Sequence, residues 1–160
     1  MISINITING RSYETAVAPH QTLVEVLRNN LGHIEVKSGC GEGECGACTV
    51  LLDGHPVSSC IVPAIKADGK EVITIKGLSE NGELHVLQQK FIEHDAVQCG
   101  YCTPGMILSA KAILDENPQA DEAEIRRKLS GNICRCTGYQ QIVNAVLSAA
   151  DEYPRHSKIT

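Results

Sequence analysis

The sequence predicts an α+β chain with a small mixed sheet in residues 1–76 and a four-helix bundle in residues 84–160. The first observation is a change of hydrophobic period, from alternation to helical spacing, across the polar stretch 77–83. The second is that the eight cysteines form two groups of four, one in each predicted half. A length of 160 residues accommodates two small domains of this kind.

The N-terminal half begins with a predicted hairpin. Residues 2–8 alternate isoleucine with polar residues, which is typical of a half-buried strand. Asn9-Gly10 is a strong two-residue turn signal, so residues 11–17 are expected to return as the second strand.

A short helix and a cysteine loop follow the hairpin. Thr22-x-x-Glu25 is a capping-box pattern that opens a helix through about Asn30, and Gly32 fits its end. Residues 37–48 contain four glycines and predict a loop.

Two further strands complete the predicted sheet. They are residues 49–53, which turn at Asp53-Gly54, and residues 72–75.

Four helices are predicted after the polar stretch, at residues 84–94, 104–116, 122–129 and 138–150. Thr103-Pro104 supplies a cap and a first-turn proline. Asp121-x-x-Glu124 and Thr137-x-x-Gln140 resemble capping boxes. Short connections between these helices favour a bundle.

The cysteine spacing indicates two metal sites. The first set reads C-x4-C-x2-C-x11-C and begins as the plant-type 2Fe–2S motif does. The second set reads C-x2-C-x31-C-x-C. The first set is Cys40, Cys45, Cys48 and Cys60, and the second is Cys99, Cys102, Cys134 and Cys136.

Structural zinc is the main alternative, because four thiolates also bind zinc and would stabilise two small halves. Three features favour iron–sulfur clusters. The first set has a single C-x2-C pair, its loop is rich in glycine so that backbone N–H groups can reach sulfur, and a C-x-C pair is unusual for zinc. No histidine pairs with a cysteine as a Rieske centre requires.

Other polar groups are expected to be ordinary surface residues. Glu42 and Glu44 are interpreted as solvated loop carboxylates, and residues 126–128 as an exposed basic helix face. Each pair of the second set precedes a predicted helix, whose N-terminus favours an anionic cluster and should raise its potential.

Composition excludes several functions. The net charge of −5 argues against nucleic-acid binding, and no apolar run reaches the roughly 18 residues of a membrane span. The N-terminus alternates and lacks the pattern of a signal peptide. A cytoplasmic location is therefore expected, where patterned cysteines are more often metal ligands than disulfides.

Three stretches carry a family resemblance. They are G-C-G-E-G-E-C-G-A-C-T-V from Gly39, V-Q-C-G-Y-C-T-P-G from Val97 and G-N-I-C-R-C-T-G-Y from Gly131. Together they resemble the small iron–sulfur subunit of the molybdenum hydroxylase family, which includes xanthine, carbon monoxide and nicotinate dehydrogenases and aldehyde oxidoreductases.

The resemblance implies a plant-ferredoxin-like (β-grasp) N-terminal domain and a helical C-terminal domain, each with one 2Fe–2S cluster. It implies that Gln98 contacts the pterin of a molybdenum cofactor in a large partner subunit and that Cys136 lies on the electron path to it. It also implies that the ferredoxin-like cluster faces an FAD-binding subunit. The chain would then carry electrons from molybdenum to FAD and NAD or another acceptor.

Three functions remain open from the residues. The chain is an electron-transfer subunit of a heteromeric oxidoreductase, an independent two-cluster ferredoxin, or a zinc-stapled interaction module without redox activity. The substrate binds elsewhere; xanthine or another purine is favoured on overall similarity, with carbon monoxide, nicotinate or aldehydes as alternatives.

Overall fold

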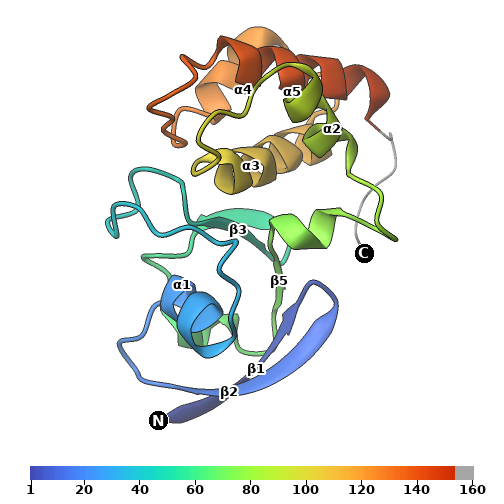
Figure 1. Cartoon of the computed structure of the whole chain (residues 1–160). Coiled ribbons are helices and arrows are strands. Elements are labelled where there is room, and N and C mark those ends of the chain that lie inside the picture. Colours follow the sequence, from blue (N-terminus) through green and yellow to red (C-terminus); the bar gives the residue numbers. More distant parts are fainter. Residues whose placement is uncertain (154–160) are drawn as a thin grey trace.

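The computed structural model describes residues 1–153, so residues 154–160 of the predicted second domain lie outside the described part. Figure 1 shows a sheet with one short helix at the N-terminal end of the molecule and four longer helices at the other end. This is a mixed α+β architecture, as predicted. The division into domains at residues 77–83 stays a prediction.

The sheet has five strands in the order β2-β1-β5-β3-β4. Strands β1 and β2 pair antiparallel around Asn9-Gly10, where both residues have positive φ, so the predicted hairpin is confirmed. Strand β5 runs parallel to β1 and antiparallel to β3, and β3 pairs antiparallel with β4. The strands are β1 (Ile2–Ile8), β2 (Arg11–Val17), β3 (Thr49–Leu52), β4 (His55–Ser58) and β5 (Glu71–Ile73).

Two details of the sheet differ from the prediction. Strand β4 was not predicted, and its four residues are exposed or half-buried, so they carry no alternating apolar signal. The last strand ends at Ile73 rather than Ile75, because Thr74 turns away to hydrogen-bond with Asn9. Ile75 begins a 3₁₀ turn, η3 (Ile75–Leu78).

The predicted helix in the first half forms in two parts, α1 (Leu23–Glu25) and a π-helical turn η1 (Val26–Asn30). The backbone N–H of Thr22 donates to the Glu25 carboxylate at 2.8 Å, as the capping-box pattern predicted. The helix buries Leu23 and Leu27 against the isoleucines of β1. A second 3₁₀ turn, η2 (Ala64–Ala67), lies before β5.

The second half contains α2 (Val86–Glu93), α3 (Thr103–Glu116), α4 (Glu122–Lys128) and α5 (Gln140–Glu152). Helix α5 packs against α2 and α4, and α3 packs against the same two helices. The Asp121 cap is confirmed, since its carboxylate accepts the N–H of Glu124 at 2.8 Å.

Two predicted helix starts are wrong. Cys102 occupies the N-cap position of helix α3 without a side-chain cap, and Thr103 is already the first helical residue. The first-turn proline, Pro104, is confirmed. Helix α5 follows Tyr139, which has φ 72°, so Thr137 lies outside the helix and does not cap it. Two consecutive residues with positive φ, Gly138 and Tyr139, separate Thr137 from the first turn.

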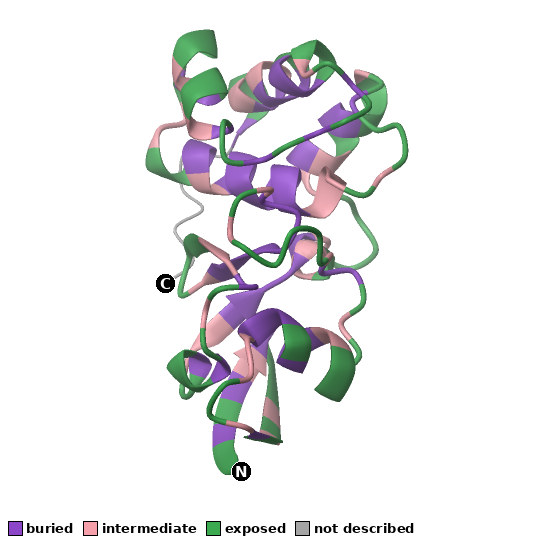
Figure 2. Cartoon of the chain, turned by 90° about the vertical axis from the view of Figure 1, so that its left-hand side faces the viewer, coloured by how far each residue is buried: buried purple, intermediate pink, exposed green. Residues whose placement is uncertain are grey.

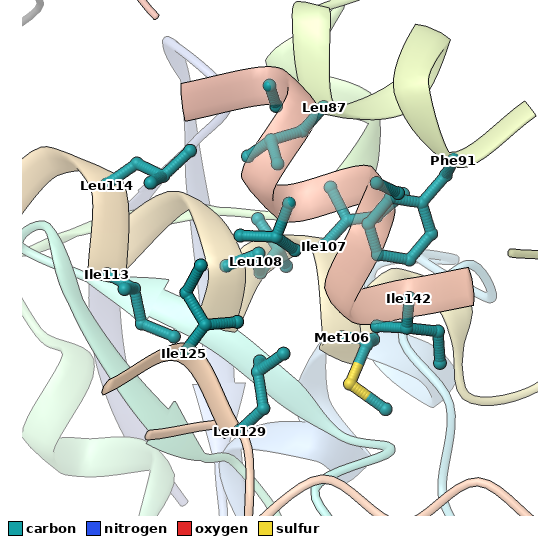
Figure 3. Packing of buried hydrophobic residues seen from close by; sticks show 14 of the residues in the cluster. Leu87, Phe91, Met106, Ile107, Leu108, Ile113, Leu114, Ile125, Leu129 and Ile142 are labelled. Carbon is teal, nitrogen blue, oxygen red and sulfur yellow. The ribbon is translucent and has the colours of Figure 1, made fainter. Parts of the chain in front are cut away.

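The helical core reaches into the sheet. Leu51 of β3 and Ile73 of β5 belong to the same buried cluster as the helical residues, and α3 lies against β3. Figure 2 shows buried residues gathered where α3 meets the sheet. Figure 3 shows the apolar side chains between the helices, including Leu87, Phe91, Met106, Leu108, Ile125 and Ile142. Both halves are therefore held in one arrangement, which fixes the cysteine loops relative to each other.

Candidate metal centres

The first cysteine set lies on the loop before β3 and just after β4. Gly41, Gly43 and Gly46 all have positive φ, a conformation that glycine adopts without strain. These reversals fold the loop back so that the Cys40 and Cys45 side chains contact each other, and Cys48 contacts Cys60. In the first pair Cys40 is exposed and Cys45 is half-buried, whereas both cysteines of the second pair are buried.

The two pairs differ in their electrostatic surroundings. Backbone hydrogen bonds, first from Glu42 and then from Cys45 and Glu44, lower the pKa of Cys40 to about 6. The Glu42 nitrogen lies 3.4 Å from the Cys40 sulfur. Burial, followed by the contact with Cys48, raises the pKa of Cys60 to about 11. The loop thus directs N–H groups at the outer thiol. Donation by N–H groups of this loop to the bridging sulfides of a cluster stays a prediction.

The second set joins the start of α3 to the loop between α4 and α5. Cys102 contacts Cys134 on the inner side, and Cys99 contacts Cys136 at the surface. Burial, followed by the contact with Cys134, raises the pKa of Cys102 to about 12. Both sets therefore consist of one inner and one outer pair.

The contacts among the thiols of each set indicate which kind of metal centre they could hold. Within residues 1–153, no three or more Cys, His, Asp or Glu side chains converge on the position of a single metal ion. The thiols of each set form two side-chain contacts, and the two pairs also interact electrostatically with each other. A 2Fe–2S cluster takes two ligands on each of two irons, so this donor arrangement fits such a cluster.

The expected pair of helix N-termini at the second set is only half present. Cys102 is the cap of α3, but Cys136 precedes the first residue of α5, Gln140, by several positions. In the turn before α5, the Thr137 hydroxyl instead donates a hydrogen bond to the Cys134 sulfur at 3.1 Å. The sequence pattern did not reveal this contact, since it assigned Thr137 to a helix cap.

Direct contacts connect the two cysteine loops. The N–H of Ile133 donates to the Cys45 carbonyl at 2.9 Å, and Asn132 Nδ2 donates to the Gly46 carbonyl at 3.2 Å. Tyr101 Oη donates to the Ser38 carbonyl at 2.6 Å. Asn132 carries no recognisable signal in the sequence, because its burial in a loop otherwise rich in exposed residues arises only in three dimensions.

Close packing accompanies these hydrogen bonds. A side chain on Gly105 would overlap the carbonyl of Gly46, so the first turn of α3 approaches the first cysteine loop at backbone distance. The absence of a Cβ at this position is what permits that approach.

The remaining predicted residues lie at the surface. Gln98 is exposed and directly precedes Cys99, and Glu42 and Glu44 are exposed on their loop. Exposed apolar side chains near the second set are Val97, Tyr101 and Ile133. No helix within residues 1–153 has the length and apolar character needed to cross a membrane.

Comparisons with known proteins agree with this geometry. A family model described as a 2Fe–2S iron–sulfur cluster binding domain matches residues 6–75, and one described as a [2Fe-2S] binding domain matches residues 74–147. The nicotinate dehydrogenase small FeS subunit of Eubacterium barkeri is 50% identical over 150 residues, covering 94% of this chain and 96% of its own. The xanthine dehydrogenase iron–sulfur-binding subunit of Escherichia coli is 48% identical over 148 residues, covering 91% and 92%.

Solved structures show the same relationship. A chain of quinoline 2-oxidoreductase from Pseudomonas putida 86 superimposes with a TM-score of 0.91 at 43% identity, covering 94% of both chains. The aldehyde oxidoreductase from Desulfovibrio desulfuricans also superimposes with a TM-score of 0.91, at 45% identity. In that comparison 95% of this chain matches 17% of the much longer oxidoreductase chain.

Proposed function

Since this chain belongs to the small iron–sulfur subunits of the molybdenum hydroxylase family, we propose that it transfers electrons between two partner subunits. One partner is a large molybdenum–pterin subunit and the other binds FAD. The chain itself carries no substrate chemistry in this proposal, and NAD or another acceptor receives the electrons from the flavin.

The cysteines are proposed as the cluster ligands. The set of Cys40, Cys45, Cys48 and Cys60 holds one 2Fe–2S cluster in a domain of residues 1–76. The set of Cys99, Cys102, Cys134 and Cys136 holds the other in a four-helix domain of residues 84–160. When bound, such clusters supply one-electron carriers. The matches of the two 2Fe–2S binding family models to residues 6–75 and 74–147 support this assignment over zinc.

One observation carries the electron-transfer role. The ligand loops are joined by the hydrogen bond from Ile133 N–H to the Cys45 carbonyl, and Ile133 is bonded covalently to Cys134. A single hydrogen bond therefore connects a proposed ligand of one cluster to a proposed ligand of the other. This connection supports electron transfer between the two proposed clusters.

The surface suggests where the partners bind. Around the second set, Gln98 and Cys136 are exposed beside Val97, Tyr101 and Ile133. We assign this face to the molybdenum–pterin subunit, with Gln98 at the pterin. Cys40 is exposed on the first cysteine loop, and Ile61, which lies beside Gly43 of that loop, is also exposed. We assign this part of the surface to the FAD subunit.

The substrate of the complex is proposed as a nitrogen-containing aromatic ring. Relatives named for nicotinate and xanthine are 50% and 48% identical to this chain, so the preference for a purine expected from sequence is not distinguished from nicotinate. One solved structure, with 43% identity, is named for quinoline, which fits the same class, while another, with 45% identity, is named an aldehyde oxidoreductase. Aldehydes are therefore the alternative substrate class. A cytoplasmic location belongs to the same proposal, because cysteines that act as metal ligands rather than as disulfides are typical of a reducing compartment.

Metal analysis and low-temperature electron paramagnetic resonance test the proposal. The reduced protein should contain about four irons and give two distinct 2Fe–2S signals. Cys45→Ser should remove one signal and Cys134→Ser the other. Stoichiometric zinc without iron would contradict the proposal. Copurification of a large molybdenum-containing subunit separates the subunit role from that of a free ferredoxin.

A further inference from the structure

The loop from Cys134 to Tyr139 is closed by hydrogen bonds that return to Cys134. Thr137 Oγ1 donates to the Cys134 sulfur at 3.1 Å, and the Thr137 nitrogen lies 3.4 Å from the same atom. The Tyr139 nitrogen donates to Thr137 Oγ1 at 3.3 Å. The Cys134 nitrogen donates to the Tyr139 hydroxyl at 2.9 Å. The three residues therefore fix one another.

This arrangement determines the direction of the hydroxyl hydrogen. The Tyr139 N–H occupies a lone pair on Thr137 Oγ1, so the oxygen already accepts one hydrogen bond. A metal-bound thiolate has no hydrogen to donate. The Thr137 hydrogen is consequently directed at the Cys134 sulfur.

Burial strengthens this contact. Thr137 and Cys134 are each only 8% exposed, so water does not compete well for either group. The first cysteine set is built differently, because Cys40 is exposed and accepts from the backbone N–H of Glu42. A side-chain substitution can remove the hydroxyl donor at Cys134 and leave the Thr137 backbone N–H in place. The donor at Cys40 belongs to the main chain and cannot be removed in this way.

We propose that the Thr137 hydroxyl raises the reduction potential of the cluster held by the second cysteine set. The proposal rests on the ligand assignment made above and treats Thr137 as a positioning residue that acts through Cys134. Reduction adds one electron and changes no bond or proton; a reduced partner centre supplies the electron in the complex, and dithionite supplies it in the test. The added negative charge strengthens the hydrogen bond to sulfur, so the reduced form gains more from it than the oxidised form.

The test compares Thr137→Val, which removes the hydroxyl at nearly constant volume, with Thr137→Ser, which retains it. Redox titrations followed by paramagnetic resonance are run on the full-length chain with any subunits that copurify. In Thr137→Val, the ratio of reduced to oxidised second cluster at fixed potential should fall about tenfold, which is about 59 mV for one electron. Thr137→Ser should stay within about twofold of the unchanged protein.

Thr103 provides a matched control. It follows Cys102 as Thr137 follows Cys136, but it is the first residue of α3. Thr103→Val should leave both potentials unchanged, and the first cluster should be unchanged in every variant.

An unaltered second potential in Thr137→Val would overturn the proposal, and so would a serine variant that behaves like the valine variant. An equal shift of both clusters would also overturn it. If Thr137→Val does not load the second cluster, Thr137→Ala takes its place. If neither loads while Thr137→Ser does, the hydroxyl serves assembly rather than potential and the proposal is wrong. An unchanged protein without two 2Fe–2S signals would instead refute the proposed function.

Discussion

Glu35 is the buried carboxylate that holds the first half of the chain to the segment leading into the helices. His33 Nδ1 and Thr74 Oγ1 each lie 2.9 Å from its Oε1. Its Oε2 forms an ion-pair contact of 3.2 Å with Lys76 Nζ, outside hydrogen-bond geometry. Burial raises its pKa, but the hydrogen bonds from His33, its own backbone and Thr74, with Lys76, lower the pKa to about 2.

Replacing Glu35 by Gln should lower the free energy of unfolding at pH 7 by roughly 2–3 kcal/mol. The folded-state pKa lies below the unfolded value, so this stabilisation is complete above about pH 4.5 and is lost as the pH falls toward 2. Urea unfolding followed by circular dichroism at several pH values measures the difference. Glu83→Gln, at an exposed position, is the control. A difference that stays constant down to pH 2 would contradict the role of ionised Glu35.

The sequence predicts which cysteines act as metal ligands, but it does not predict which residues hydrogen-bond to them. The spacing of Cys40, Cys45 and Cys48 indicated a cluster loop, and the glycines indicated N–H donors. The contact between Thr137 and Cys134 was missed because a threonine three residues before a glutamine also fits a capping box. Local patterns of this kind do not distinguish a helix cap from a tight turn before a helix.

Helix α3 illustrates how one small residue positions an element. Gly105 lies in its first turn, against the carbonyl of Gly46 in the first cysteine loop. Gly105→Ala should therefore push the helix from the loop and lower the free energy of unfolding by roughly 1–3 kcal/mol. A fall in Tm of the iron-loaded protein at one scan rate measures the effect.

Gly131→Ala is the matched control, because a Cβ there meets nothing within 4 Å. Equal Tm values for the two alanine variants would show that the approach of α3 to the loop is not tight.

Helix α4 depends on a single side-chain cap. Asp121 accepts the N–H of Glu124 at 2.8 Å, and the helix has only 7 residues. Asp121→Ala should cost about 1 kcal/mol, whereas Asp121→Asn should cost little, because both Asp and Asn are good caps. Chemical denaturation of the three proteins provides the comparison. If Asp121→Asn lost as much free energy of unfolding as Asp121→Ala, the negative charge of Asp121, rather than its hydrogen bond, would stabilise the helix.

Elements with a strict period were predictable, and those set by tertiary contacts were not. Strand β1 and its hairpin followed from isoleucine alternation and Asn9-Gly10. Strand β4 was missed because it is at the sheet edge and has no buried face. The last strand was predicted to extend to Ile75 because Ile75 continues the apolar alternation. In the structure the strand ends at Ile73, since the Thr74 N–H donates to the Asn9 side chain instead of to a neighbouring strand.

At the scale of the whole molecule, the hydrophobic clusters and the exposed parts of the cysteine loops are expected to differ in local stability. The helices and the sheet are held by buried apolar residues. Residues 38–46, 97–101 and 131–138 lack regular secondary structure and are mostly exposed or half-buried. Metal ligation is therefore expected to order these loops more than the rest of the chain.

Removal of iron should accordingly raise amide hydrogen exchange in these three loops while β1 and α3 stay protected. Mass spectrometry of peptides from the iron-loaded and iron-free chain provides the readout. Reconstitution with iron and sulfide should restore the original pattern. A uniform loss of protection across the sheet and the helices would show instead that the clusters hold the entire fold.

The link between Asn132 and Gly46 also has a consequence for the order of events during synthesis. The two residues are 86 positions apart, and Ile133 holds Cys45 from the same distant loop. When the ribosome has just synthesised the first cysteine set, Asn132 and Ile133, which hydrogen-bond to its loop, have not yet been made. The loop that carries three thiols of that set therefore lacks these hydrogen bonds until the final third of the chain has been made. We expect stable insertion of the first cluster to occur after translation, when both loops are present.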